Sequence, residues 1–240
     1  RLVLLAGGDA RRALGCVEAC AATCVDGDTI TVAMVTEAFQ HRALQHDRDG
    51  DLHYDLLSAL HKSLRNSDVQ AAVYWLARAL EAGADPVHAA RRLVAMAAED
   101  IGLADPMALQ VAVAAQQALQ FLGLPEGRLP LTEAVVYLAA APKSNAVMRA
   151  ITAASEAAQK GPQHPVPLHL RNAATGLQKE LGHGRGYVYA HDTAAGVAAF
   201  ECLPPELKGA TFFTPGERGF EKKVAERMAE NDAHRRKARG

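Results

Sequence analysis

The sequence has few aromatic residues, almost no net charge and no long apolar run. Phe, Trp and Tyr make up 5% of the 240 residues, whereas hydrophobic residues as a whole make up 49%. This composition, rich in alanine and aliphatic residues, favours tightly packed helices over a β-sandwich with large aromatic cores. The net charge of −1 gives no global electrostatic case for nucleic-acid binding. No apolar stretch approaches the ~20 residues of a membrane-spanning helix, so no membrane partner is expected.

Cysteine is also scarce, and its spacing argues against a metal site. Cys16, Cys20 and Cys24 recur every four residues on one face of a helix predicted over residues 9–23, and the fourth is Cys202. Eight residues of helix span ~12 Å. One zinc ion at ~2.3 Å from each sulfur therefore cannot reach both end cysteines. We expect small buried side chains here, and reduced thiols typical of a cytoplasmic protein.

Motifs for nucleotide hydrolysis are missing. The pairs Lys62-Ser63 and Lys143-Ser144 lack the preceding strand and glycine-rich turn of a phosphate-binding P-loop. The run that ends in Glu99-Asp100 resembles the acidic end of a metal-binding strand, but its order is reversed and it lies on a predicted helix. The sequence therefore predicts neither a magnesium site nor any other metal site.

The ten histidines do not suggest an active site either. His53 and His61 are eight residues apart, without the four-residue spacing of a His-Glu-x-x-His metal pair. A nucleophile–His–Asp assembly could be drawn from Ser144 or Cys202 with His183 or His191 and Asp192, but no local motif supports one. Structural or surface histidines are the favoured interpretation.

The sequence does contain a series of helix signals. A helix over residues 85–101 is predicted between the signals Asp85-Pro86 and Asp105-Pro106, because Asp is a good N-cap and Pro suits the first helical position. One helix is predicted after a cap at Thr31, carrying apolar residues from Val32 to Phe39, and another opens at Asp51 and includes Tyr54–Leu60. Further helices are predicted over residues 71–82 (after a capping box at 67–70), 107–122, 131–141, 144–160 and 221–235. The predicted fold is an all-α helical array with an irregular C-terminal wrap.

The chain divides at its most polar stretch. Residues 45–51 contain no apolar side chain and are predicted to be a linker. They would separate a helical region, 1–44, from a larger helical domain, 52–223. Residues 224–240 would form the end of the last helix and a basic tail. The chain begins at Arg1 rather than Met, which suggests a piece of a longer polypeptide.

The acidic pair Glu99-Asp100 lies near the predicted C-terminal end of its helix. There the helix dipole disfavours negative charge by ~0.3–1 kcal/mol. We therefore expect a cationic partner from another element or from a neighbouring subunit.

The stretch Gly8–Leu14 places an arginine in the first turn of a helix, after a tight glycine turn. Arg11 there is either a solvated side chain or a contact to phosphate, which arginine binds through two parallel hydrogen bonds. Arg12 is the weaker neighbouring candidate.

Several motifs, in order along nearly the whole chain, carry a resemblance. Gly8–Leu14 resembles the sensor-2 motif in the lid of clamp-loader-type AAA+ ATPases. Together with later motifs it resembles the C-terminal part of the RarA/MgsA family of replication-associated recombination ATPases, related to Werner-helicase-interacting protein. Those later motifs are Tyr54–Ser63, Ala97–Pro106, Tyr137–Asn145, Pro167–Ala173 and Tyr189–Asp192.

The resemblance implies a function for the whole protein and a limited one for this chain. It implies a DNA-dependent ATPase at stalled replication forks, cytoplasmic and nucleoid-associated, with single-stranded-DNA-binding protein among its partners. Residues 1–44 would be the C-terminal portion of the AAA+ lid, and 52–223 a helical collar that assembles homotetramers. ATP and Mg would be held upstream of residue 1, with Arg11 as the sensor-2 residue and Arg12 beside it, so this chain alone would not be an enzyme.

Two alternatives remain to a tetramerisation module. One is a nucleic-acid-binding module that uses the basic tail, chiefly Arg235, Arg236 and Lys237, with Arg185; the same tail could instead be a solvated end. The other is a free-standing helical enzyme. The first alternative requires affinity for single-stranded DNA that falls steeply with salt, and the second requires turnover that depends on a named His or Ser.

Overall fold

Every regular element is a helix among the residues that the computed structural model describes, which are 2–6, 10–24, 27–161 and 163–239. The prediction of an all-α fold is confirmed. The α-helices are α1 (Leu2–Ala6), α2 (Ala10–Ala21), α3 (Val32–Arg65), α4 (Val69–Glu81), α5 (Pro86–Met96), α6 (Met107–Leu122), α7 (Arg128–Ala140), α8 (Ala146–Lys160), α9 (Gly176–Glu180) and α10 (Glu221–Arg239). A π-helical turn, η1 (Ala97–Ile101), and a 3₁₀ turn, η2 (Gly102–Ala104), follow α5.

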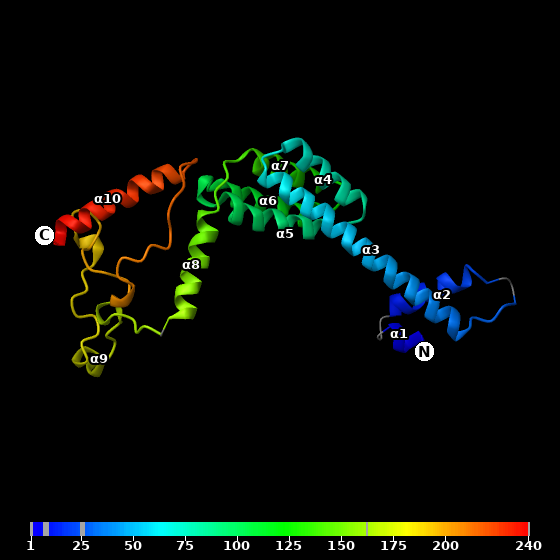
Figure 1. Cartoon of the computed structure of the whole chain (residues 1–240), viewed down its shortest axis with the longest axis horizontal. Helices are drawn as coiled ribbons and strands as arrows, with labels where there is room; N and C mark the ends of the chain where they lie inside the picture. The colour runs from blue at the N-terminus through cyan, green and yellow to red at the C-terminus, as the bar shows by residue number, and fades with distance from the viewer. Residues whose placement is uncertain (1, 7–9, 25–26, 162, 240) are drawn as a thin grey trace.

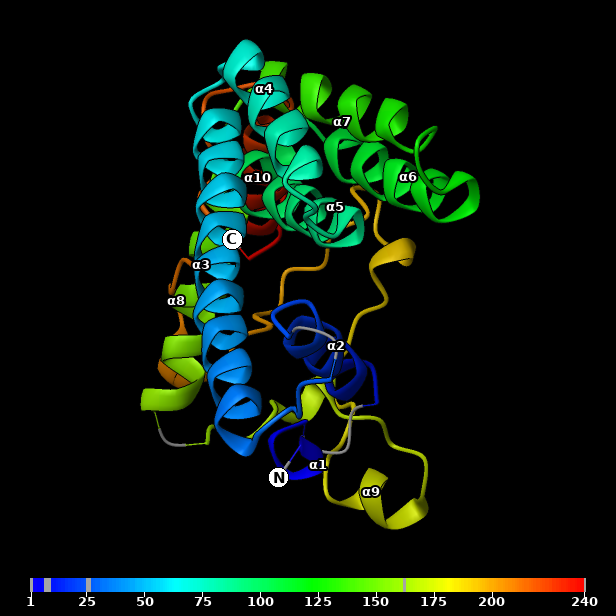
Figure 2. The same ribbon diagram turned by 90° about the vertical axis from the view of Figure 1, so that its right-hand side faces the viewer.

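The helices form three parts along the long axis (Figure 1). Helices α1 and α2 pack on the first part of α3, and the second part of α3 packs with α4, α5 and α7, while α6 packs on α5 and α7. We call residues 53–141 the central block. Beyond it, α8 leads to the C-terminal segment, residues 161–220, and α10 closes the chain. Figure 2 shows α3 as one long helix with α4 and α5 beside its second part.

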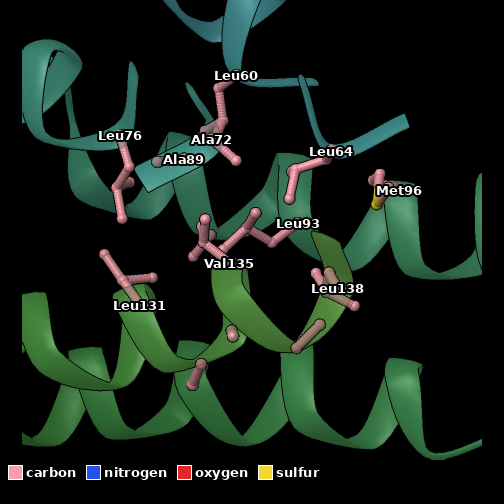
Figure 3. Close-up of a cluster of buried hydrophobic side chains, with 14 of the residues drawn as sticks. Leu60, Leu64, Ala72, Leu76, Ala89, Leu93, Met96, Leu131, Val135 and Leu138 are labelled. Carbon is pink, nitrogen blue, oxygen red and sulfur yellow. The ribbon is translucent and has the colours of Figure 1, made fainter. Parts of the chain in front are cut away.

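The core of the central block is made of aliphatic side chains from all five helices α3 to α7. Leu60 and Leu64 on α3 point toward Leu93 on α5 and Leu138 on α7 (Figure 3). Each of these four side chains is at most 1% exposed. Full burial of one such side chain contributes about 1.5–3 kcal/mol. This packing fixes the spacing of α3 and α5, between which the polar side chains described below are held.

The helix starts predicted at Asp85 and Asp105 are confirmed, whereas α4, α7 and α8 begin two or three residues away from their predicted starts. The Asp85 carboxylate accepts a hydrogen bond from Val87 N (2.9 Å), and that of Asp105 accepts one from Met107 N (3.0 Å). The expected cap at Ser67 is wrong: Ser67 is left-handed (φ 59°), and the N-cap is Asp68, which accepts from Ala71 N. Asp9, the predicted cap of α2, lies outside the described residues.

The polar stretch 45–51 does not interrupt the helix. Helix α3 runs without a break from Val32 to Arg65, so the predicted linker is wrong as a break in secondary structure. Gln and Arg are good helix formers, and the single glycine, Gly50, costs only about 1 kcal/mol. A polar composition indicates a solvated helix as readily as a loop. The division into the domains 1–44, 52–223 and 224–240 stays a prediction.

A second, smaller cluster joins α2 to the start of α3. Cys16 and Cys20 are buried against Val35, with Leu2 and Leu5 beside them. The cysteine stripe is therefore packing, as predicted, and Cys24 at its end is only partly buried.

The C-terminal segment has no comparable core. In the described part of the chain, no hydrophobic side chain after Ala146 is buried. The segment returns to the central block at its far end, where Phe220 N donates to Ala104 O (2.8 Å). The Glu221 side chain, fully buried, accepts a hydrogen bond from Gly216 N. Within the described ranges, no helix is long and apolar enough to cross a membrane.

Candidate functional site

A network of charged and polar side chains links α3, α5 and η1 in the central block. His61 Nε2 lies 2.9 Å from Asp100 Oδ2, and both side chains are buried. Arg65 Nε donates to Asp100 Oδ1 (2.7 Å), and its Nη2 donates to Asp100 Oδ2 (3.2 Å). From α5, Arg92 Nη2 lies 3.0 Å from His61 Nδ1. The π-helical turn brings Asp100 to this place because it widens the helix at its end.

The ring of His61 contacts three charged side chains. Arg92 Nη2 lies 3.0 Å from Nδ1, and Arg65 Nη2 lies 3.0 Å from Nε2, which also faces Asp100. A guanidinium can only donate, so both ring nitrogens face a donor. Asp100 in turn receives donors on both oxygens. The contact with His61 thus orients Arg92 without placing a carboxylate beside it.

Arg65 supplies the cation that was expected for Glu99 and Asp100. Its Nη2 also lies 3.5 Å from Glu99 Oε1. The hydrogen bond to Asp100 raises the pKa of Arg65, so the side chain stays charged under all ordinary conditions. The Arg65 side chain is 51% exposed and that of Asp100 only 10% exposed, so the pair reaches from the interior to the surface. The prediction of a partner from another element is confirmed.

His61, Glu99 and Asp100 also place three ligand atoms within 4.8 Å of one another, a spacing compatible with a metal ion. The guanidinium of Arg65 already bonds both oxygens of Asp100 and approaches Glu99. A metal ion would have to displace this arginine from a carboxylate that it binds through two nitrogens. The group is therefore satisfied as an ion-pair network.

The second Lys-Ser pair has a structural role. Lys143 Nζ donates to Leu138 O, Ala139 O and Ala141 O, at 2.9, 2.9 and 2.6 Å. These three bonds use all three ammonium hydrogens at the C-terminal end of α7, where cations are favoured. Burial lowers the pKa of Lys143, and the negative charge of Asp100 opposes that shift. Lys143 has no donor left for a phosphate.

The histidines singled out in the sequence are mostly bound to backbone or stacked. His53 Nε2 lies 2.7 Å from Ala82 O. His183 Nδ1 lies 3.4 Å from Asn172 O, and the ring of His191 is 5.0 Å from that of Tyr189. Ser144 Oγ accepts from Ala146 N. The structure brings none of these histidines to Ser144 or Cys202 through a hydrogen bond between described residues.

The predicted sensor-2 arginines lie at the start of α2. The backbone of Arg11 and Arg12 is helical. Their side chains, with the preceding Gly8 and Asp9, lie outside the described part of the chain. Their role in nucleotide binding stays a prediction.

The basic tail is the end of a helix. Helix α10 continues to Arg239, beyond the predicted end at Arg235. Arg235 pairs with Asp232 (2.8 Å), and Arg239 pairs with Glu201 (3.0 Å) and donates to Ala199 O. Arg236 and Lys237 occupy the last turns of the same helix, and their binding of nucleic acid stays a prediction.

Sequence reasoning missed Arg65 and Arg92. Both fall on predicted helices, where an arginine is usually a solvated side chain. A signal was available for Arg65, because it lies four residues after His61 and so on the same face of the helix. No comparable signal marks Arg92, which meets His61 only through the packing of α5 on α3.

Two family models together match nearly the whole chain. The model described as the C-terminal part of the MgsA AAA+ ATPase matches residues 66–232, and one described as an AAA C-terminal domain matches residues 1–65. The border between the two matches therefore falls at the end of α3.

Curated proteins show the same similarity. Replication-associated recombination protein A of Escherichia coli K12 is 46% identical over 230 residues, covering 94% of this chain and 52% of that protein. The protein of that name from Haemophilus influenzae is 47% identical over 232 residues, with the same coverage. The ATPase WRNIP1 of Dictyostelium discoideum is 43% identical over 186 residues, covering 77% of this chain and 21% of that protein. The chain spans about half the length of the bacterial relatives that it matches.

Proposed function

Because this chain belongs to the family of the MgsA AAA+ ATPase C-terminal region, we propose that it is the assembly part of a DNA-dependent ATPase of replication-associated recombination. In this proposal the central block and the C-terminal segment form a homotetramer, and α1 and α2 belong to the lid over a nucleotide. Hydrolysis, with ATP and Mg, is assigned to a further region of the protein. The absence of a P-loop from this sequence supports that division.

The observation that carries the assembly role is the exposure of large apolar side chains in the C-terminal segment and α8, where no described hydrophobic side chain after Ala146 is buried. Six of them are half-exposed or more. They are Ile151 (64%), Val166 (56%), Leu177 (66%), Leu181 (60%), Tyr187 (52%) and Tyr189 (54%). A region that exposes its large apolar side chains and buries none of them favours cover by other protein. A second copy of the chain would provide that cover.

Light scattering of the chain at tens of micromolar tests the proposal. We expect a mass near four times 25.5 kDa. Leu177→Asp together with Leu181→Asp should shift the mass toward the monomer, because the charges cannot be buried unpaired. Tyr74→Asp, on an exposed tyrosine of α4, is the matched control and should leave the mass unchanged. A strictly monomeric wild-type chain would overturn the assembly role.

The sensor-2 role is tested in a longer protein that includes the ATPase region. Arg11→Ala should reduce ATP hydrolysis by about two orders of magnitude, as expected for losing a charged contact to a transferred phosphate. Arg12→Ala, at the neighbouring position, should have a smaller effect. Equal rates for the two variants and the wild type would remove the role. DNA and single-stranded-DNA-binding protein remain proposed partners of the full-length protein.

A further inference from the structure

A pocket of about 310 Å³ opens between α3 and α5, directly over the His61 network. Its volume is at the lower end for ligand pockets and suits one charged group with part of a flat ring. Cations outnumber anions on its wall by three to one. The lining residues are Tyr54, Leu57, Ser58, His61, Lys62, Arg65, His88, Arg92 and Glu99.

The three cations of this pocket differ in how far their charge is compensated. Arg65 is paired with Asp100 and, at longer range, with Glu99. No described carboxylate lies within ion-pairing distance of Arg92 or Lys62. Arg92 Nη2 lies instead 3.0 Å from His61 Nδ1, and this contact holds the guanidinium in place. A pre-positioned, uncompensated arginine loses little conformational entropy on binding an anion. The wall therefore favours an anion next to Arg92 and Lys62.

An exposed aromatic ring, that of Tyr54, also lines the pocket, and a simple anion would make no use of it. Tyr54 is 74% exposed, although Leu56 and Leu57, which follow it on α3, are buried. Flat aromatic side chains next to a basic groove provide a platform on which nucleic-acid bases stack. Ser58, one turn further along α3, adds a hydroxyl donor at the same wall. Arginine, lysine, a hydroxyl and an aromatic ring together match a nucleotide unit of a single strand better than an acidic peptide.

We propose that this pocket holds a phosphate group of a single nucleic-acid strand, with Arg92 and Lys62 bound to the phosphate and Tyr54 stacked on an adjacent base. The choice of a nucleic-acid strand rests on the proposed function. The anion site itself rests on the pocket. Locally concentrated charge makes the site compatible with a chain whose net charge is −1.

Fluorescence anisotropy of a labelled oligodeoxythymidine, titrated with the 240-residue chain over a range of salt concentrations, tests the phosphate contact. Arg92→Gln should weaken binding about tenfold and reduce the slope of log affinity against log salt by about 0.7, the value for one lost contact to a single strand. Arg92→Lys keeps the charge but loses the two parallel hydrogen bonds of a guanidinium, so its affinity should lie between those of the wild type and Arg92→Gln. Arg91→Gln is the matched control: it removes the same charge from an exposed position of α5 outside the pocket, and should match the wild type.

The stacking contact is tested at Tyr54. Tyr54→Ala should weaken oligonucleotide binding about fivefold or more, whereas Tyr54→Phe keeps the ring and should bind like the wild type. Tyr74→Ala removes another exposed tyrosine, from α4, and should have no effect. The salt slope should stay unchanged in all three variants, because no charge is altered.

Other results would overturn the proposal. Equal affinities for Arg92→Gln and Arg91→Gln would mean that the pocket does not contact the strand. If only the deletion of residues 234–240 abolished oligonucleotide binding, the binding site would be the basic tail. Displacement of the oligonucleotide by poly-glutamate as readily as by unlabelled DNA would indicate an acidic protein partner. Competition by inorganic phosphate or ATP at equal concentration, unaffected by Tyr54→Ala, would indicate a free phosphate ligand.

Light scattering on the same samples separates this inference from the proposed function. A tetrameric Arg92→Gln chain with wild-type DNA affinity refutes the pocket and leaves the assembly role intact. A monomeric wild-type chain that loses DNA binding on Arg92→Gln refutes the assembly role and leaves the pocket. Dissociation of the oligomer by Arg92→Gln itself would mean that the pocket is part of a subunit contact.

Discussion

The central block and the C-terminal segment place their apolar residues in opposite ways. In the block, Leu93 and Leu131 are 0% exposed, whereas in the segment Leu177 is 66% and Tyr189 is 54% exposed. The ion-pair network of the block has a buried carboxylate, Asp100, whereas in the pair Arg239–Glu201, which joins α10 to the segment, both side chains are about 40% exposed. The block thus has the interactions of a unit that folds by itself. The segment has apolar residues, as a folded region does, but it does not bury them in a core of its own.

The largest expected difference between the two regions is in the cost of a lost leucine side chain. Leu93→Ala should lower the free energy of unfolding of the central block by about 3–5 kcal/mol, because it leaves a cavity in a filled core. Leu177→Ala in the segment should change the same transition by less than ~0.5 kcal/mol. Urea unfolding followed by circular dichroism measures both. Similar losses would mean that the segment shares the core.

The ion pairs give the next contrast. Asp100→Asn should lower the free energy of unfolding by about 2–3 kcal/mol, because it removes the charge that Arg65 binds. Breaking a fully buried pair would cost more, but the Arg65 side chain is half-exposed. Glu201→Gln should cost less than ~1 kcal/mol, as expected for an exposed pair. A double-mutant cycle of Asp100→Asn with Arg65→Gln isolates the coupling. A coupling near zero would contradict the role given to Arg65.

The connection between the two regions is tested at Gly219. A Cβ at this position would overlap Ala104 O, and the backbone there has a φ of +56°. Gly219→Ala should therefore weaken the contact between the start of α10 and the central block by at least ~1–2 kcal/mol. Amide exchange of Phe220, which bonds Ala104 O, should become about tenfold faster or more.

Gly209 provides the control for this comparison. It has a φ of +84°, and no atom lies within 4 Å of the place that a Cβ would take, so Gly209→Ala adds backbone strain without a clash. Exchange of the Phe220 amide should be unchanged in that variant. If both alanine variants speed exchange equally, backbone strain alone explains the effect.

The smallest expected effect concerns Tyr137 in the block. Its hydroxyl donates to Asp105 (2.7 Å), which raises the pKa of Tyr137 above its ordinary value. This stabilisation is present below pH ~10, the pKa of an unfolded tyrosine, and is lost as pH rises through the higher folded pKa. Tyr137→Phe should cost at most about 1 kcal/mol at pH 7 and remove this alkaline dependence. Urea unfolding at pH 7 and pH 11 measures both, with Tyr74→Phe as control.

Features that depend on neighbouring residues could be predicted from the sequence, and features that depend on packing could not. The caps at Asp85 and Asp105 involve donors two residues away. That Glu99 and Asp100 need a cation also follows from their own helix. The identity of that cation did not, because Arg65 is 35 residues from Asp100 and meets it only when α3 packs on η1.

The continuity of α3 shows a case in which a local sequence signal led to a wrong prediction. Residues 45–51 carry a strong local signal for a linker, and the helix runs through them. A polar composition is typical of loops, but it is equally typical of a helix that bridges two packed regions. The pocket under Tyr54 was out of reach for the same reason as Arg65: its wall comes from α3 and α5 together.

The unbroken α3 makes the central block mechanically continuous with the N-terminal helices. Its 34 residues form a rod of roughly 50 Å, at ~1.5 Å per residue. Helices α1 and α2 pack on one end of this rod, and His61 and Arg65 project from the other. A tilt of only a few degrees at the first end would swing the second by several ångströms, which exceeds the tolerance of a hydrogen bond. The helix therefore links the region of α1 and α2 to one wall of the Arg92 pocket as a single continuous element.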